Sequence, residues 1–95
     1  MPYTYILECR NKSLYTGSTR NLEKRIYEHE QGLGSNYTKI RRPVKLIYYE
    51  EYERIDDAFN REKQLQTWSN KKKLALVNRE FEDLSKLANP RKPSI

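Results

Sequence analysis

Two short segments near the start of the chain have the composition of paired β-strands. Residues Tyr3–Cys9 and Leu14–Ser18 are rich in aromatic and β-branched side chains, which favour strands. The polar stretch RNKS between them predicts a turn, so the two segments should form an antiparallel hairpin. A third segment, VKLIYYEEY after Pro43, is apolar enough to be the middle strand of a sheet. The chain is therefore expected to contain a three-stranded antiparallel sheet.

Helical patterns follow the hairpin. Thr19 or Asn21 can cap a first helix, because either side chain can accept a hydrogen bond from a free backbone N–H group. Gly32 and Gly34 should end this helix, since glycine readily takes the left-handed conformation found after helices. The stretch GLGSNYTKIRRP that starts there has no periodicity and predicts a polar, basic loop before the third strand.

The last part of the chain is predicted to be helical. A long helix should span residues 56–68, and a shorter one should span residues 71–77. The element order is then ββαβαα, an α/β chain of the α+β kind in which helices flank a small three-stranded antiparallel sheet. We expect residues 1–78 to form one domain and residues 79–95 a C-terminal extension, a short helix followed by a mobile tail.

The charge and the few special residues narrow the class of protein. The chain has 19 Lys and Arg against 13 Asp and Glu, a net charge of +6, which fits a polyanionic partner such as nucleic acid. One cysteine, Cys9, and one histidine, His29, exclude a zinc site of the usual ligands, and the lone cysteine favours a reducing compartment. The segment MPYTYILECR does not read as a signal peptide, and no stretch is apolar enough to span a membrane. We expect a cytoplasmic protein that binds no membrane.

One carboxylate interrupts the apolar face of the predicted long helix. Glu62 lies among four apolar residues at helical spacing, Ile55, Ala58, Phe59 and Leu65. Burying a carboxylate without a partner is costly, so this residue needs an explanation. Two interpretations are open. Glu62 either forms an internal salt bridge or a half-exposed edge of the stripe, or it is a metal ligand at the floor of a cleft.

Two side chains of the first helix could act at such a site. Arg25 and His29 are four residues apart and are therefore neighbours on one helix face. A guanidinium can hold a phosphate with two hydrogen bonds, and an imidazole can accept or release a proton near neutral pH. Alternatively, Arg25 forms a surface pair with a nearby Glu, and His29 is a solvated or hydrogen-bonded surface residue.

Two basic clusters could bind phosphates. The first lies in the predicted loop beside Tyr37, whose ring could stack on a base, and the second lies in the helical turn after Asn70. Cations in a first turn are unfavourable near the positive end of the helix dipole, and an anionic partner would relieve that cost. A solvated surface is the alternative for both clusters. The candidate nucleic-acid-binding residues are Lys39, Arg41, Arg42, Lys63, Lys71, Lys72 and Lys73.

Tyr5 and Tyr15 stand in the two strands of the hairpin. An even-numbered turn would place them on opposite faces of the sheet, whereas an odd-numbered loop or a bulge would place them on the same face. Tyrosine also favours strands for structural reasons alone. Their positions by themselves therefore assign neither phenol a chemical task.

These elements together resemble the GIY-YIG nuclease superfamily, in particular its small stand-alone, single-domain branch. The tripeptide YTY is followed by YTG, with an interval of ten residues from Tyr5 to Tyr15, then by NLEKRIYEHEQG and by NREKQLQTW. The resemblance covers residues 2–77. It implies a metal-dependent endonuclease, a hydrolase that cuts phosphodiester bonds.

The resemblance also implies roles for single residues. Gly17 matches a glycine that closes the second tripeptide and has a structural role. Glu62 matches the family's metal-binding glutamate. The family's late asparagine has no clean match, since Leu74 stands at its place and Asn70 and Asn78 flank it. The implied catalytic residues, in chain order, are Tyr5, Tyr15, Arg25, His29 and Glu62.

The expected reaction uses a single divalent ion, Mg²⁺ or Mn²⁺, because one carboxylate is well placed. Arg25 would neutralise charge on the phosphate, and Tyr5 would be the general base if nearby cations lower or poise its pKa, ordinarily about 10. Phosphate contacts should dominate binding, so DNA would be cut with little sequence preference and binding would weaken with salt. DNA repair or recombination would be a fitting setting, and we expect a monomer without a small-molecule cofactor.

Two other interpretations are open. The first is a non-catalytic nucleic-acid-binding module on the same fold, which would explain the positive charge equally well. The second is a protein-interaction module that uses three apolar residues at helical spacing in the C-terminal segment, Phe81, Leu84 and Leu87.

Overall fold

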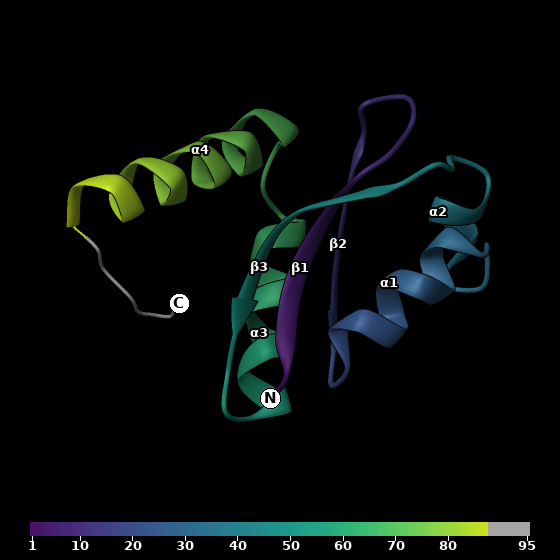
Figure 1. Cartoon of the computed structure of the whole chain (residues 1–95), viewed down its shortest axis with the longest axis horizontal. Coiled ribbons are helices and arrows are strands. Elements are labelled where there is room, and N and C mark those ends of the chain that lie inside the picture. The colour runs from purple at the N-terminus through teal and green to yellow at the C-terminus, as the bar shows by residue number, and fades with distance from the viewer. Residues whose placement is uncertain (88–95) are drawn as a thin grey trace.

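The central strand of the sheet is β1 (Tyr3–Glu8), which lies between β2 (Leu14–Thr19) and β3 (Lys45–Glu51) and is antiparallel to both (Figure 1). The computed structural model describes the backbone of residues 1–87 and the side chains of residues 1–78. The prediction that β3 is the middle strand was wrong. Burial explains the difference, because β1 has four consecutive buried residues whereas β3 has only Tyr48 buried.

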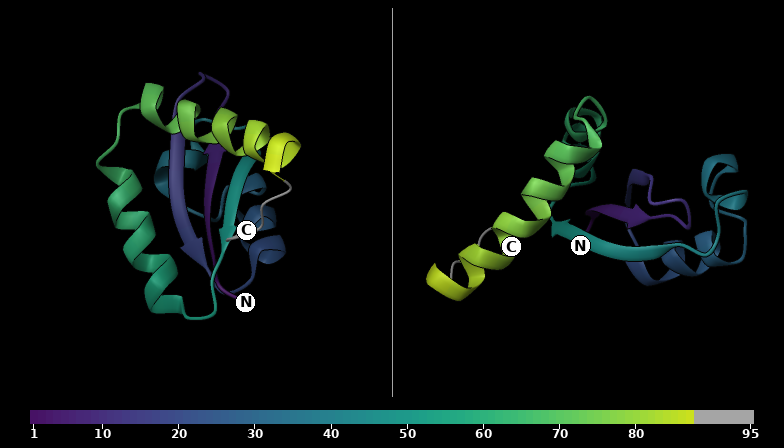
Figure 2. Two further views of the ribbon diagram at one scale, coloured as in Figure 1. Left: turned by 90° about the vertical axis from the view of Figure 1, so that its left-hand side faces the viewer. Right: turned by 90° about the horizontal axis from the view of Figure 1, so that it is seen from above.

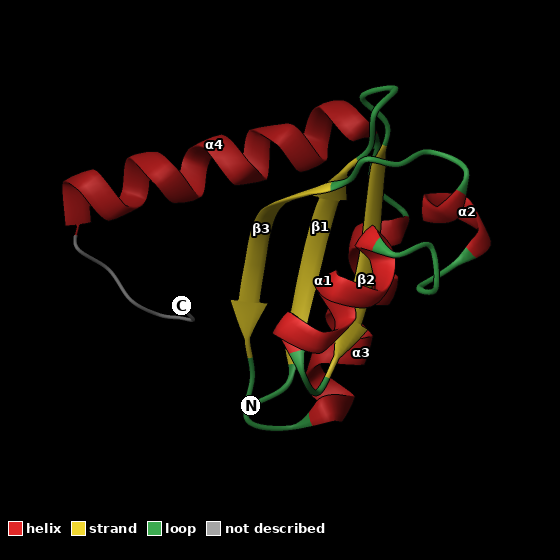
Figure 3. Ribbon diagram, turned by 45° about the vertical axis from the view of Figure 1, so that its right-hand side comes forward, coloured by secondary structure: helices red, strands yellow, loops and turns green. Residues whose placement is uncertain are grey.

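Helices cover both faces of the sheet. Helix α1 lies against one face and helix α3 against the other (Figure 3). The predicted order ββαβαα is confirmed, with one extra helical turn, α2, inside the predicted loop. None of the helices in the described part of the chain has both the length and the apolar character needed to cross a membrane. The helices are α1 (Leu22–Glu30), α2 (Asn36–Lys39), α3 (Ile55–Gln66) and α4 (Asn70–Leu87).

Two apolar clusters, one on each face, hold the layers together. The cluster under α1 is built on Tyr5, Leu7 and Cys9 of the sheet side, with Leu22 and Ile26 of the helix packed against it. The cluster on the opposite face contains Ile6, Leu14, Tyr48 and Leu65, with Leu76 and Val77 of α4 packed against it. Helix α4 therefore belongs to the α3 side, and it runs across one end of the sheet (Figure 2).

The helix boundaries follow from local capping. Asn21, one of the two predicted candidates, caps α1, because its side chain accepts a hydrogen bond of 3.1 Å from the backbone N–H of Lys24. Gly32 lies just beyond the end of α1 with a φ of 81°, a conformation that favours glycine. Ser35 caps α2 by accepting from the backbone N–H of Thr38 at 3.1 Å.

One continuous helix, α4, replaces the two helical segments predicted after residue 70. Residues 71–77 and the predicted helix beyond residue 79 are parts of this single element, which ends at Leu87. The predicted mobile tail lies outside the described residues, as do the side chains of Phe81, Leu84 and Leu87. The division at residue 78 stays a prediction.

Candidate active site

The register of the hairpin places Tyr5 and Tyr15 on the same face of the sheet. Tyr5 pairs with Gly17, and Leu7 pairs with Tyr15, so all four residues point to the α1 side. A loop of five residues, 9–13, joins the strands. The loop is odd-numbered, which is the alternative that brings the two phenols together.

Gly17 makes room for the Tyr5 ring. A Cβ atom at Gly17 would lie 2.5 Å from the phenolic oxygen of Tyr5 and 3.2 Å from Cε2 of Tyr15. The first of these distances is too short for any side chain. Glycine at this position thus allows the Tyr5 phenol to lie over the backbone of β2, toward the edge of the sheet.

His29 lies under the Tyr5 phenol and is fully buried. Its Nε2 is 2.9 Å from the Tyr5 hydroxyl, and its Nδ1 is 2.8 Å from the hydroxyl of Thr38. Its ring also packs edge-on against Tyr15, with centroids 5.2 Å apart. The interpretation of His29 as a surface residue was therefore wrong. Gly34 explains the burial, because its backbone covers the imidazole so closely that a Cβ there would be 2.2 Å from Nδ1.

The two pKa values in this pair show which groups carry protons. Burial raises the pKa of Tyr5 to about 12, although a hydrogen bond from Arg25 opposes the shift. Burial lowers the pKa of His29 to about 4, and the charge of Arg25 adds to this. At neutral pH both groups are therefore uncharged, and the phenol donates to Nε2 in the tautomer in which Nδ1 carries the imidazole proton and donates to Thr38.

Arg25 is held in place before any ligand arrives. Its Nη1 forms an ion pair of 2.9 Å with Glu28, and its Nη2 donates to the backbone oxygen of Gly34 at 3.0 Å. Burial alone would lower the pKa of Arg25, but hydrogen bonds to Glu28 and Tyr5 outweigh it and raise the pKa. The expected ion pair between Arg25 and a nearby Glu is present, and Arg25 also lies beside Tyr5.

Glu62 lies on α3, half-buried against the end of β2. Its Oε1 accepts from the Ser18 hydroxyl at 2.5 Å, and its Oε2 accepts from the Gln66 side chain at 2.8 Å. No cationic side chain pairs with it among residues 1–78. The internal salt bridge was therefore wrong; Glu62 is half-exposed, which is compatible both with a stripe edge and with a metal ligand. Phe59 is 47% exposed, so it belongs to the flank of the helix and not to the buried stripe.

A pocket of about 360 Å³ opens where β2 passes into α1. Ser18, the partner of Glu62, lines it from β2, and Arg25 lines it from α1. Glu62 reaches the edge of this pocket through its hydrogen bond with Ser18, although α3 packs on the other face of the sheet, and its charge adds to the raised pKa of Tyr5. Tyr5, Tyr15, His29 and Glu62 do not line the pocket itself; we call the pocket, together with these four residues next to it, the cleft.

The cleft fits a loosely held divalent ion and not a caged one. No group of three or more His, Cys, Asp or Glu side chains suited to a metal occurs within the described residues. Mg²⁺ needs few protein ligands, because it keeps several waters and binds substrate phosphate. Glu62 has only neutral hydrogen-bond donors around it, so its negative charge is available to such an ion.

The first basic cluster borders the cleft. The Tyr37 ring lies 5.9 Å from the Tyr15 ring, and the Arg41 guanidinium lies 3.8 Å above Tyr37. Arg42 donates to the backbone oxygens of Lys39 and Glu30, which ties the loop to α1. The arginines of this cluster thus also stabilise the loop that covers His29.

The second basic cluster lies on α3 and α4. Lys63 covers the Phe59 ring at 4.7 Å, and Lys72 covers the Trp68 ring at 4.2 Å. Lys71 is exposed, but Lys73 is buried, and burial lowers its pKa. Lys73 shares the inner face of α4 with Leu76 and Val77, so it is not a surface cation.

Three residues of this site were not predicted from the sequence, and two predicted residues had no clear place in it. Ser18, Thr38 and Gly34 contact Glu62 or His29 directly. The Ser35–Thr38 spacing is a capping pattern that could have indicated the helical turn α2 and the position of Thr38. Asn70 and Asn78 lie on α4, and neither lines the pocket beside Arg25.

The family model of the GIY-YIG catalytic domain matches residues 1–75. UPF0213 proteins of Staphylococcus saprophyticus and Clostridium perfringens are each 47% identical to the chain, over 76 and 78 residues. The alignments cover 80% and 82% of the chain, and 93% and 84% of the relatives. The solution NMR structure of a UPF0213 protein from Bacillus halodurans has a TM-score of 0.56 and 34% identity, covering 95% of this chain and 100% of that one.

Proposed function

This chain belongs to the GIY-YIG family, as its motifs predicted, and we propose that it is a metal-dependent endonuclease that hydrolyses phosphodiester bonds in DNA with little sequence specificity. The observation that carries the proposal is the environment of Tyr5. Its buried hydroxyl is hydrogen-bonded to His29, beside Arg25 and within the influence of Glu62. A tyrosine that served only the sheet would need none of these neighbours.

Arg25 is proposed to bind the phosphate that is cut. Charge builds up on the phosphate oxygens in the transition state, and a guanidinium already fixed by Glu28 and Gly34 needs no reorientation to stabilise it. Such an interaction is stronger in the transition state than in the bound substrate, which is the condition for catalysis.

Tyr5 and His29 are proposed to move the proton. Because the pKa of Tyr5 is raised, its phenol is not ionised at neutral pH. The proposed mechanism therefore does not use the tyrosine with a lowered pKa that the sequence suggested. As Tyr5 takes a proton from the attacking water, its own proton passes to Nε2 of His29, to which it is already hydrogen-bonded. The water oxygen then attacks phosphorus, and the bond to the leaving oxygen breaks. The negative phosphate favours protonated His29, because an adjacent anion raises the pKa of an imidazole. Tyr15, packed on His29, would orient the water or the phosphate.

Glu62 is proposed to hold the single divalent ion, Mg²⁺ or Mn²⁺. A bound ion of this kind stabilises the negative charge of the leaving oxygen. Ser18 and Gln66 fix the carboxylate of Glu62 in one orientation by a hydrogen bond to each oxygen.

Binding is proposed to be mostly electrostatic. The net charge of +6 and the two basic clusters favour contacts to phosphates, which carry no sequence information. A role in DNA repair or recombination in the cytoplasm would suit a nuclease of this kind. We further propose that the protein acts as a monomer without a small-molecule cofactor, with residues 1–78 as the catalytic domain.

The alternative is a nucleic-acid-binding module without activity. One observation favours it: Arg25 already forms an ion pair with Glu28, which neutralises its charge without a phosphate. Loss of catalysis in such a module would leave the basic clusters and the salt-dependent binding unchanged.

Nicking of supercoiled plasmid DNA in the presence of Mg²⁺ or Mn²⁺ tests the proposal. We expect the wild-type protein to cut, and Glu62→Ala and Arg25→Ala to abolish cutting. Glu53→Ala is a matched control, because Glu53 is an exposed glutamate outside the cleft. DNA binding that weakens with salt, without cutting under either metal, would establish the inactive module.

A further inference from the structure

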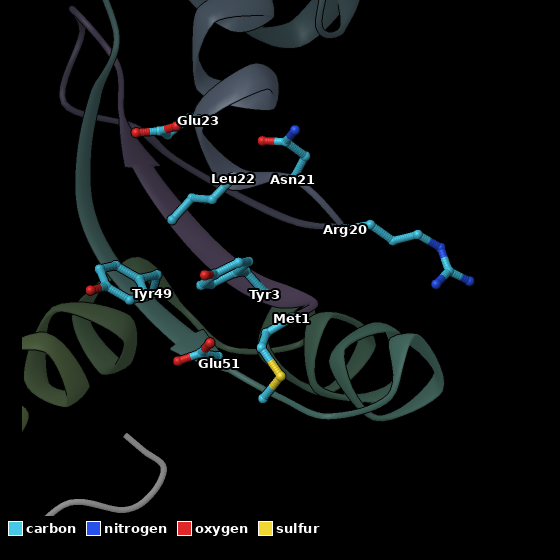
Figure 4. Close-up of a pocket in the computed structure, with 8 residues that line it drawn as sticks. All are labelled: Met1, Tyr3, Arg20, Asn21, Leu22, Glu23, Tyr49 and Glu51. Atoms are coloured by element: carbon cyan, nitrogen blue, oxygen red, sulfur yellow. The ribbon is translucent and has the colours of Figure 1, made fainter.

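A second pocket, of about 370 Å³, lies on the sheet face that α1 covers only in part (Figure 4). Helix α1 packs over Tyr5, Leu7 and Cys9, which leaves the other end of the same face open. The open end carries Tyr3 of β1 and Tyr49 of β3, which share a face with Tyr5 because Tyr5 and Tyr49 are cross-strand partners. The volume lies within the range of small-molecule sites, about 300–1,000 Å³.

Two aromatic rings form the floor of this pocket. The centroids of Tyr3 and Tyr49 are 5.8 Å apart and their planes meet at 70°, an edge-to-face contact. Tyr49 is nevertheless 52% exposed, so one face of its ring is open to a ligand. Aromatic rings exposed on a sheet are the usual platform for stacking unpaired bases.

The carboxylates beside the rings disfavour a phosphate on the rings themselves and suit a base. Glu51 and Glu23 both line the pocket. Glu51 is the cross-strand partner of Tyr3 and lies beside it (Figure 4), and partial burial and the charge of Glu51 both raise the pKa of Tyr3. Two carboxylates repel an anion, but they accept hydrogen bonds from the exocyclic amino groups of bases.

Arg20 connects this pocket to the cleft. Arg20 and Asn21 line both the pocket over Tyr3 and the pocket beside Arg25. Arg20 is exposed, and its side chain extends away from the two rings (Figure 4). It makes no ion pair or side-chain hydrogen bond within residues 1–78. It is therefore available to bind a phosphate between the two pockets.

We propose that the pocket over Tyr3 and Tyr49 holds one unpaired nucleobase of the substrate, next to the phosphate at Arg25. The inference rests on the proposed function, because it assigns the nucleotide that flanks the cut. A base paired in a duplex is stacked between its neighbours and cannot lie on the Tyr49 ring. The pocket therefore selects substrates with an unpaired nucleotide beside the cut site, such as flaps and gaps.

The test uses a flap DNA with 2-aminopurine at the unpaired nucleotide beside the junction, and a fully paired duplex of the same length. Binding is measured in EDTA, so that cutting cannot interfere. We expect 2-aminopurine fluorescence to fall when the wild-type protein binds, because the base stacks on Tyr49. Tyr49→Leu should abolish this quenching and weaken flap binding about tenfold, the effect of losing one stacked base, with duplex affinity unchanged.

Two variants control for a trivial loss of structure. Tyr27→Leu makes the same change at a tyrosine that is 59% exposed on α1 and lines neither pocket, so it should leave quenching and affinity at the wild-type level. Tyr49→Trp keeps an aromatic face and should retain the quenching. Circular dichroism confirms that each variant is folded.

The possible outcomes separate this inference from the proposed nuclease activity. A Tyr49→Leu protein that binds flap and duplex like the wild type, or loses both equally, overturns the pocket assignment. If the wild-type protein nevertheless nicks plasmid with Mg²⁺, the base pocket is overturned and the proposed nuclease activity stands. Quenching that depends on Tyr49 in a protein that never cuts supports the pocket and overturns the nuclease.

Discussion

Two carboxylates, Glu50 on the neighbouring strand β3 and Glu62 on α3 itself, have different hydrogen-bond partners. Glu50 of β3 has a side chain that is 12% exposed, and it accepts two hydrogen bonds from Arg61, at 2.9 and 3.1 Å. The hydroxyls of Tyr48 and Tyr52 also donate to it. Glu62, the residue after Arg61, accepts only from neutral Ser18 and Gln66 within the described residues.

The difference would separate a structural acid from the proposed metal ligand. Burial alone would raise the pKa of Glu50, but the hydrogen bonds from Arg61 and the two tyrosines outweigh it and keep the pKa below its usual value. Its charge is thus neutralised inside the protein. Among residues 1–78 the charge of Glu62 has no cationic partner, so a cation from outside the protein can pair with it. We expect mutation of the first to affect stability and mutation of the second to affect activity.

The largest expected effect is that of Glu62→Gln on cutting. The amide keeps the size and one acceptor of Glu62 but cannot hold a divalent ion by charge, so Mg²⁺-dependent cleavage should fall by at least about a thousandfold. The free energy of unfolding, measured by thermal unfolding with circular dichroism, should change by less than about 1 kcal/mol, because no ion pair is broken. A variant that unfolds easily but, when folded, cuts at the normal rate would reverse the comparison.

Tyr5→Phe should reduce cleavage by about 100- to 10,000-fold, the usual contribution of a general base. It should also cost about 1–2 kcal/mol of stability, because the buried Nε2 of His29 loses its hydrogen-bond partner. Single-turnover cleavage, measured well below the melting temperature, separates the two effects. DNA affinity in EDTA is the control and should not change. A variant that cuts at the wild-type rate would remove Tyr5 from the mechanism.

Glu50→Gln should act on stability alone. It leaves Arg61 without its counter-charge, and breaking a fully buried pair costs about 3–5 kcal/mol. Both side chains keep some exposure, so we expect about 2 kcal/mol, measured by urea unfolding. Cleavage per folded molecule should equal that of the wild type. A loss of cleavage without a loss of stability would show that Glu50 is not merely structural.

The last prediction compares the pH dependence of stability that His29 and Glu50 contribute. The pKa of His29 falls from 6.5 to about 4 on folding, so the unfolded chain binds more protons and stability should fall as the pH drops from 6.5 to 4. Glu50 has a lowered pKa, so its contribution should be lost only as the pH falls below about 4.5. His29→Gln should remove the fall in stability between pH 6.5 and 4 and leave the fall below about pH 4.5 unchanged. Urea unfolding from pH 3 to 8 measures both. An unchanged slope above pH 4.5 would contradict this.

Most of the framework could be predicted from local patterns. The hairpin, the capping Asn21 and the anomalous position of Glu62 are properties of short stretches, and period and composition report them directly. The central place of β1 could not be predicted, because β1 and β3 have similar compositions and only tertiary contacts decide which one is covered on both sides.

The surroundings of the catalytic candidates depend on distant parts of the chain. His29 is buried by Gly34 and Thr38, and Glu50 is paired with Arg61 eleven residues later. Neither contact follows from helical or strand periodicity, because each joins a regular element to a separate loop or helix. The sequence could propose candidate reactive residues, but the burial and hydrogen bonds that set their pKa values required the folded chain.

The hydrogen atom that serves as the side chain of Gly17 makes this cleft sensitive to changes of size as well as of chemistry. A methyl group there would displace the Tyr5 phenol from His29 while leaving every polar atom of the cleft present. A structure of such a protein would still contain every functional group, although the proposed proton transfer from Tyr5 to His29 would be blocked. Inspection of functional groups alone would therefore overlook one way in which this domain can be switched off.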